Sequence, residues 1–211
     1  MGPAMTFAEL RYLIYADLYR YHGRTGPGVF LRELLWGIGG KFGIWLRVTS
    51  FLARRSRLWL PLYLPARLML RRYTIRFGIH VPFSTAIGPG LCIPHPGGIF
   101  VSARARIGRN CNLSHGVTIG VSNRGQRQGC PTIGDNVYLG PGAKIFGKVT
   151  VGNGSAVGAN CVVTRDVPEN GVVVGVPGRV ISLDGSAGYV NRTDYDRHLR
   201  VPLPFRSPDD G

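Results

Sequence analysis

The chain has 211 residues, enough for one sizeable domain with a smaller appendage, and its 44% hydrophobic content excludes a largely disordered protein. Its net charge is +15, and the excess is concentrated up to His80, where 13 Lys and Arg stand against 3 Asp and Glu. Such a basic half favours an anionic partner, which could be nucleic acid, an anionic membrane or an anionic substrate. A solvated basic surface is the alternative.

The sequence indicates neither a leader nor a membrane span. Residues 1–16 lack the basic start and the clean apolar core of a signal peptide. Arginines interrupt every apolar run well short of the length that crosses a bilayer. Cys92, Cys111, Cys130 and Cys161 form no CxxC pair and have no zinc-finger spacing, so we expect free thiols in a reduced cytosolic chain.

Residues 1–76 are expected to form a helical N-terminal domain. Apolar residues recur at helical spacing in "FAELRYLIYADLYRY" and "FGIWLRVTSFLARR", which predicts about three helices, broken near "GRTGPG" and by the prolines of "LWLPLYLPARL". The last helix is amphipathic and basic, with Arg67, Arg71 and Arg72 beside residues 68–70. Two roles stay open for this domain: a cap that closes a solenoid and oligomerises, or contact with an anionic membrane surface.

Further along, an aliphatic residue recurs every six positions: Ile133, Leu139, Ile145, Val151, Val157 and Val163. A period of six fits neither an amphipathic helix nor an alternating strand, and it is the hexapeptide signature of a parallel β-helix. Three such units make one coil, and the inward aliphatics stack from coil to coil. We therefore predict a mainly β fold, a parallel β-helix of hexapeptide repeats over 77–181, followed by a tail over 182–211.

The repeat is interrupted twice, and both interruptions are informative. The segment "VSNRGQRQGC" is polar and basic, so it predicts a loop over 120–131 that leaves the coil. The other interruption, between Ile93 and Val101, contains "PHPGG" and places His95 at a broken turn. Loops on a rigid scaffold commonly carry function, so we expect His95 to be presented to solvent rather than packed.

These segments resemble a known family. The stretch "IGPGLCIPHPGGIFVSARARIGRNCNLSHGVTIG" and, after the loop, "PTIGDNVYLGPGAKIFGKVTVGNGSAVGANCVVTRDVPENGVVVGVPGRVI" resemble the hexapeptide acyltransferases, and most narrowly their serine acetyltransferase-like branch. The helical part with "YADLYRY" and the tail with "GYVNRTDY" resemble members from capsule and exopolysaccharide pathways. The resemblance implies a left-handed coil, a homotrimer or a dimer of trimers, and acetyl-CoA bound in a cleft between neighbouring subunits.

The chain departs from the serine acetyltransferase pattern at three places. Pro94 stands where the family has an aspartate directly before its catalytic histidine, and His80 stands where it has an aspartate that orients this histidine. Cys130 replaces a second active-site histidine at the end of the loop. Acidic residues suit an amino-acid ammonium group, so their loss predicts weaker binding of serine but leaves acetyl transfer possible.

By the same resemblance His95 falls on the catalytic histidine. A neutral imidazole can accept the proton of an acceptor hydroxyl as a general base. Pro94 and Pro96 would stiffen the backbone on either side, and Gly97 and Gly98 would let a substrate approach closely. A structural histidine on the turn is the alternative.

The other histidines and the loop cysteine have two interpretations each. His115 should point outward near the cleft, as a substrate contact or a surface residue. His80 could relay to His95 or make a plain contact with the cap. Cys130 could be a nucleophile for a covalent acetyl intermediate, or a small apolar wall of the acceptor pocket.

The donor side is carried over from the family onto matching positions. The residues expected along acetyl-CoA are Gly140, Pro141, Gly142, Ala143, Lys144, Ala159 and Arg179. Lys144 and Arg179 are candidates for the nucleotide phosphates, with a solvated surface role as the alternative.

The sequence thus predicts an acetyl-CoA-dependent O-acetyltransferase that transfers the acetyl group directly to a sugar hydroxyl of a surface polysaccharide or its precursor. The alternative is a serine O-acetyltransferase of cysteine biosynthesis. Metal-dependent hydration on this type of solenoid needs three clustered histidines, which the spacing does not provide, so no metal is expected. The repeats lack aromatic residues between their basic ones, so we expect no nucleic acid. We expect a cytoplasmic enzyme, at the inner face of the membrane if the helices touch lipid.

Overall fold

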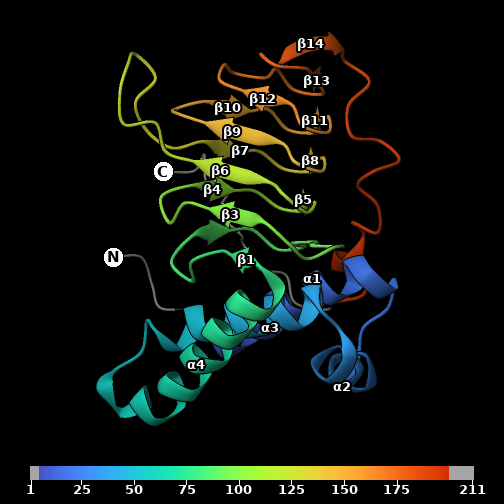
Figure 1. Cartoon of the computed structure of the whole chain (residues 1–211). Coiled ribbons are helices and arrows are strands. Elements are labelled where there is room, and N and C mark those ends of the chain that lie inside the picture. Colours follow the sequence, from blue (N-terminus) through green and yellow to red (C-terminus); the bar gives the residue numbers. More distant parts are fainter. Residues whose placement is uncertain (1–4, 200–211) are drawn as a thin grey trace.

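The computed structural model describes residues 5–199 and consists of a helical domain at one end of a three-sided coil (Figure 1). The helical domain comprises α1 (Phe7–His22), α2 (Pro27–Trp36), α3 (Gly39–Leu52), the short 3-10 helix η1 (Arg57–Trp59) and α4 (Leu60–Phe77). Thr6 and Glu9 form a capping box that starts α1, and Gly23 ends this helix in the left-handed conformation. The break expected near "GRTGPG" lies between α1 and α2.

The expectation that the prolines of "LWLPLYLPARL" break the helical pattern holds only in part: α4 begins directly before Pro61 but continues through Pro65, and the domain has four α-helices where about three were expected. Pro61 lies in the first turn of α4, where its missing N–H has no intrahelical partner to lose. Pro65 lies inside α4, and the helix continues through it to Phe77.

The coil has three faces of short strands. Face A consists of β1 (Ile79–His80), β3 (Ile99–Val101), β6 (Thr118–Gly120), β9 (Lys144–Phe146) and β12 (Val162–Val163). Face B consists of β2 (Ala86–Ile87), β4 (Arg106–Ile107), β7 (Thr132–Ile133) and β10 (Thr150–Val151). Face C consists of β5 (Asn112–Leu113), β8 (Tyr138–Leu139), β11 (Ala156–Val157), β13 (Val172–Val174) and β14 (Arg179–Ser182). All pairs are parallel except β13 with β14, so the predicted parallel β-helix is confirmed.

The six-residue period places one aliphatic ladder inside each face. On face A, Val101 pairs with Ile119, Ile119 with Ile145 and Ile145 with Val163, and all four are buried. The coil begins with β1, which pairs with β3 through Ile79, inside the predicted range 77–181. The position six residues after Ile79 is the polar Thr85, so the aliphatic period becomes visible in the sequence only from Ile87.

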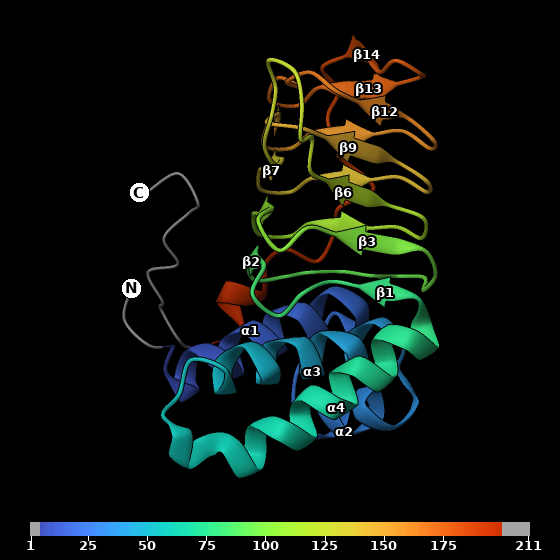
Figure 2. The same cartoon turned by 60° about the vertical axis from the view of Figure 1, so that its left-hand side comes forward.

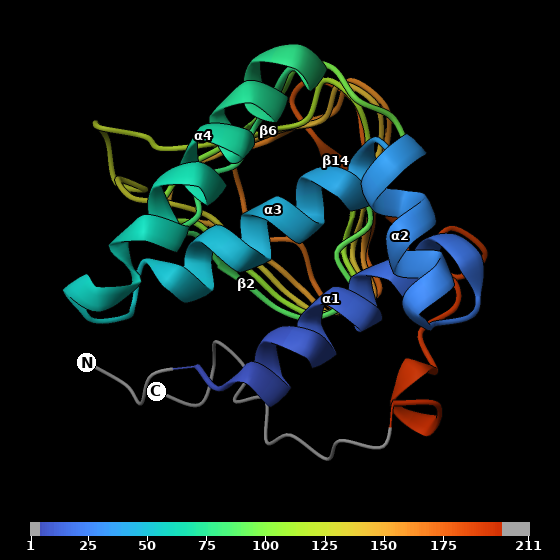
Figure 3. The same cartoon turned by 90° about the horizontal axis from the view of Figure 1, so that it is seen from below.

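The helices close the lower end of the coil, as Figures 2 and 3 show. Phe42 and Leu46 of α3 and Leu70 of α4 belong to the same buried cluster as Ile79 and Ile99 of the first rungs. Among residues 5–199, no helix is long and apolar enough to cross a membrane.

After β14 the chain returns along face C toward α1 (Figure 1). Tyr189 stacks on Tyr138 with ring centroids 4.5 Å apart. The short helix η2 (Tyr195–Arg197) then buries Tyr195 completely against Tyr12 and Tyr19 of α1.

Candidate functional site

The loop that carries His95 lies between β2 and β3, at the edge where face C turns into face A. The side chains of His95, Pro94 and Pro96 are exposed, so the imidazole faces solvent, as the sequence predicts. Gly97 and Gly98 both have positive φ, at 108° and 64°, which lets the chain re-enter β3 directly after the histidine.

Helix α1 holds the backbone that leads into His95. Asp17 accepts a hydrogen bond of 2.8 Å from the N–H of Leu91, and the hydroxyl of Tyr21 accepts one of 2.7 Å from the N–H of Ile93. Burial raises the pKa of the Tyr21 hydroxyl well above its ordinary value, so this group stays protonated and can donate to the carbonyl of Ile93. The approach to His95 is therefore fixed by side chains from another domain.

Arginine side chains bind the carbonyl groups of the same segment. Arg47 of α3 pairs with Asp17 in a buried contact of 2.9 Å and donates to the carbonyls of Ile87 and Gly88. Arg20 of α1 donates to the carbonyl of Gly90 at 2.9 Å. These contacts cross-link the helical domain to residues 87–93, which satisfies backbone groups that the broken coil leaves unpaired.

Successive coils stack closely above the His95 loop. The N–H of Gly116 donates to the carbonyl of Gly97 at 2.8 Å, and the N–H of Gly142 donates to the carbonyl of His115 at 2.9 Å. A Cβ on Gly116 would lie only 3.2 Å from the Cα of Gly142, so this column is kept free of side chains. The edge therefore ascends from His95 through His115 to residues 140–143.

The expected donor-side residues divide between this edge and the far end of the coil. The N–H of Asn160 donates to the carbonyl of Pro141, which places Ala159 one rung above residues 140–143. Lys144 is half-buried and donates to the hydroxyl of Thr118 at 3.2 Å and to a carbonyl of the rung below. Arg179 lies on β14, exposed and remote from His95 along the coil.

The structure brings two of the predicted site residues together, since the rings of His95 and His115 lie next to each other. Their ring centroids are 6.4 Å apart with the rings nearly perpendicular. Neither ring forms a hydrogen bond within the described chain, so the nitrogens of His95 are available to a substrate.

His80 and Cys130 lie apart from this pair. The ring of His80 stacks on Phe100 with centroids 5.9 Å apart, and the described chain contains no hydrogen bond from His80 to His95. Cys130 lies at the opposite edge of face A, where its sulfur is 3.3 Å from the hydroxyl of Ser102. One subunit alone therefore does not bring the loop cysteine to His95.

A cavity of about 590 Å³ opens beside the His95 loop. It is lined by residues 35–38, Lys41, Arg76, Phe77 and residues 96–97. Lys41 donates to a carbonyl at residue 35 and lies 5.6 Å from an aromatic ring, while Arg76 is exposed. The lining of this cavity thus contains two cationic side chains, Lys41 and Arg76, beside apolar residues, and it contains no carboxylate.

Sequence reasoning missed this cavity. The available signal was "LLWGIGGKFG", a glycine-rich helix junction that holds one of only three lysines in the chain. At Gly39 a Cβ would lie 2.0 Å from the carbonyl oxygen of Ile93, so the junction packs directly on the His95 loop.

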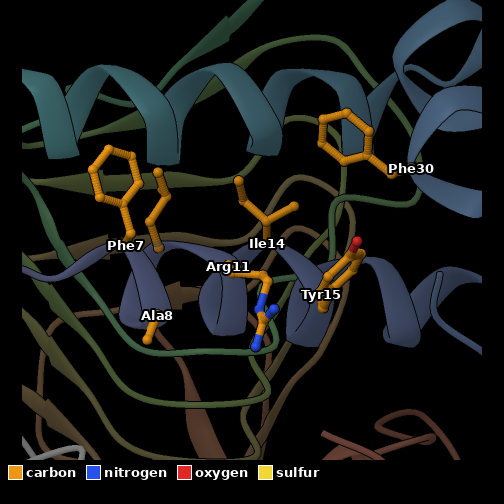
Figure 4. A pocket seen from close by; sticks show the side chains of 7 residues that line it. Phe7, Ala8, Arg11, Ile14, Tyr15 and Phe30 are labelled. Carbon is orange, nitrogen blue, oxygen red and sulfur yellow. The ribbon is translucent and has the colours of Figure 1, made fainter. Parts of the chain in front are cut away.

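A second cavity, of about 510 Å³, lies along α1 and away from the loop (Figure 4). Figure 4 shows Phe7, Ala8, Arg11 and Tyr15 on α1, with Phe30 of α2 facing them. None of the predicted site residues lines it.

The two acidic residues nearest to His95 in the sequence, Glu33 and Asp135, are engaged elsewhere. Between Glu33 and Asp135 the sequence contains no Asp or Glu. Glu33 contacts His22 at 2.9 Å, and Asp135 binds the backbone N–H of Arg109. The His95 edge of one subunit is therefore free of carboxylates from this long stretch. In residues 5–199, no group of three or more His, Cys, Asp or Glu is arranged to hold a metal ion.

Comparisons with known proteins agree with this architecture. The bacterial transferase hexapeptide family (six repeats) matches residues 130–165. A serine acetyltransferase of Bacillus pumilus (strain SAFR-032) is 31% identical over 175 residues, which cover 82% of this chain and 77% of the relative. A serine acetyltransferase of Bacillus subtilis (strain 168) is 34% identical, with 72% and 69% covered.

Solved structures give the same result. The crystal structure of serine acetyltransferase from Brucella abortus strain S19 has a TM-score of 0.69 at 29% identity, covering 83% of this chain and 70% of that one. Soybean serine acetyltransferase complexed with serine has a TM-score of 0.68 at 33% identity, with 82% and 69% covered. The coil is thus the left-handed β-helix of hexapeptide repeats, and the chain belongs to the serine acetyltransferase family of hexapeptide-repeat acyltransferases.

Proposed function

We propose that this protein is an O-acetyltransferase that moves the acetyl group of acetyl-CoA directly to an acceptor hydroxyl, with His95 as the general base. The observation that carries the proposal is the exposed His95 imidazole, which has no hydrogen-bond partner in the described chain. The backbone that leads into its loop is held by side chains of α1 and α3. Family membership supports acetyl-CoA as the donor.

The thioester is already activated, so the protein has to remove a proton and position two substrates. His95 accepts the proton of the acceptor hydroxyl as its oxygen attacks the thioester carbonyl carbon. The carbon–sulfur bond then breaks, and the leaving sulfur takes the proton from the imidazolium. A Cβ on Gly97 would meet no atom within 4 Å, so open space adjoins the histidine where a substrate can enter.

The donor would lie along the edge above His95. Gly140, Gly142 and Ala159 carry small or no side chains there, which suits an extended pantetheine chain, and Pro141 lies between the two glycines. The side chain of Ala143, expected along the donor, is instead buried in the core of the coil. Because Lys144 already binds the rung below, Arg179 is the freer cation for nucleotide phosphates.

Of the two acceptors that the sequence analysis considered, the comparisons favour L-serine over a sugar. The relatives and structures described above carry the name serine acetyltransferase, and one was solved with serine. We therefore take L-serine as the first acceptor to test.

A second acceptor class is retained on one observation. The cavity beside the His95 loop offers Lys41 and Arg76 and no carboxylate, so it suits an anionic acceptor better than an ammonium group. A sugar hydroxyl on a phosphate-bearing precursor fits this charge.

The test is CoA release from acetyl-CoA by the purified protein, with L-serine and with a panel of free and nucleotide-linked sugars in parallel. Formation of an acetyl ester, identified by mass spectrometry, supports the proposal, and the productive acceptor decides between the two classes. Acetyl-CoA binding without transfer to any hydroxyl in the panel would contradict it.

A further inference from the structure

Helix α4 has two apolar stripes, and only one of them is covered. The inner stripe packs on the rest of the domain and consists of Tyr63, Ala66, Leu70, Tyr73 and Phe77. The second stripe faces outward and consists of Leu60, Leu64, Leu68 and Ile75, which are between 49% and 73% exposed. Leu58 of η1 extends it and is 89% exposed. The spacing of four between the first three residues keeps them on one line of the helix.

Arginines lie within and beside this outer stripe, since Arg71 precedes Ile75 by four residues and Arg72 follows Leu68 by four. Arg71 and Arg72 are exposed, and neither forms a hydrogen bond or an ion pair within the described chain. Arg67 packs over the ring of Phe83 at 4.7 Å. Neither η1 nor α4 contains an acidic residue, so nothing on these helices neutralises the charge.

We propose that the η1–α4 face, defined as Leu58, Leu60, Leu64, Leu68, Ile75, Arg71 and Arg72, docks this protein on the surface of an anionic lipid bilayer. An exposed apolar stripe that also carries arginines suits a helix that lies in the interface, with its leucines among the acyl chains and its long arginine side chains reaching the headgroups. Figures 2 and 3 show α4 at the outer edge of the helical domain, where a flat surface can reach it.

The charge of the η1–α4 face favours an anionic bilayer over a second copy of this chain as its partner. In a symmetric contact between two such faces, arginines would meet arginines with no carboxylate on either side, and like charges at an interface disfavour association. An anionic bilayer supplies the missing negative charge and an apolar layer at once.

Docking in this way has a consequence for the cavity beside His95. Arg76 and Phe77 lie at the end of α4 and also line that cavity. A bilayer held against α4 therefore lies next to the entrance for an acceptor that resides at the membrane.

The experiment is sedimentation of the full chain with vesicles of phosphatidylcholine alone and of phosphatidylcholine with 30% phosphatidylglycerol, at low and high salt. We expect binding to the anionic vesicles only, reduced at least several-fold by high salt. The variant Arg71→Gln/Arg72→Gln should lose most of this binding, and so should Leu64→Ser/Leu68→Ser. The control Arg104→Gln/Arg165→Gln removes the same charge from the coil and should bind like the unmodified protein.

Three outcomes would overturn the proposal: equal binding to neutral and anionic vesicles, equal loss in the control, or no binding at all. Light scattering is measured on the same samples. A smaller oligomer in Leu64→Ser/Leu68→Ser without any vesicle binding would assign the face to protein association instead. Acetyl-CoA turnover without vesicles is measured for the same two surface variants. Retained turnover with lost vesicle binding shows that the membrane proposal and the proposed function are tested independently.

Discussion

Tyr21 shows how a single hydroxyl connects the helical domain to the chemistry. It accepts the N–H of Ile93 at 2.7 Å, two residues before His95. The sequence predicts that Tyr21 lies on a helix. It does not predict the hydrogen bond to Ile93, because the two residues are 72 positions apart and no local pattern links them. The exposure of His95, by contrast, could be predicted, because its proline and glycine neighbours and the broken repeat mark a turn in the sequence itself.

Removing this hydroxyl by Tyr21→Phe should leave the buried N–H of Ile93 unpaired, at a cost of about 1–3 kcal/mol in the free energy of unfolding. Because the loop is then less firmly held, kcat should fall while the KM for acetyl-CoA changes little. The control Tyr15→Phe lies on the same helix and changes neither value. An unchanged kcat in Tyr21→Phe would exclude a positioning role.

Buried thiols predict a dependence of stability on pH. Burial raises the pKa of Cys92 to about 11 and that of Cys111 to about 12. In the unfolded chain these thiols ionise at lower pH than in the folded one, so the unfolded state binds fewer protons above about pH 9. The free energy of unfolding should therefore fall as pH rises from about 9 to about 11.

Urea denaturation between pH 8 and pH 10.5 measures this slope. The variant Cys92→Ala removes one of the buried thiols whose pKa is raised and should flatten the curve in that range. The same slope in the variant and in the unmodified protein would contradict the assignment.

At the scale of elements, the repeat predicted the inward aliphatic ladders but not the contacts that attach the helices to the coil. Each six-residue unit contains one buried aliphatic position, so the positions of the strands could be predicted from the spacing alone. The contacts of Arg47 with Asp17 and with the carbonyl groups of Ile87 and Gly88 arise only when α3 is laid across the first coil. No period in the sequence encodes such a cross-link.

Breaking this buried pair by Arg47→Met should cost about 3–5 kcal/mol, because the buried carboxyl of Asp17 loses its cationic partner. The double variant Asp17→Asn/Arg47→Met should cost less than the sum of the two single changes, since the two side chains act as a unit. Chemical denaturation gives all three values. Strict additivity would mean that the pair is not coupled.

At the scale of the whole molecule, the separation of His95 and Cys130 on opposite edges of face A requires a neighbour if both belong to one site. The homotrimer expected from the sequence resemblance would provide that neighbour. We expect light scattering to give three or six times the chain mass of 23.0 kDa. A monomer with full activity would exclude a shared site.

The central claim is that His95 acts as the base for acetyl transfer, and the initial rate of CoA release with the productive acceptor tests it most directly. In His95→Ala the rate should fall by about 10²–10⁴-fold, with acetyl-CoA binding retained. The control His198→Ala, an exposed histidine on the returning tail, should keep the rate of the unmodified protein. If His95→Ala keeps its rate, the histidine is a structural part of the turn and the base lies elsewhere.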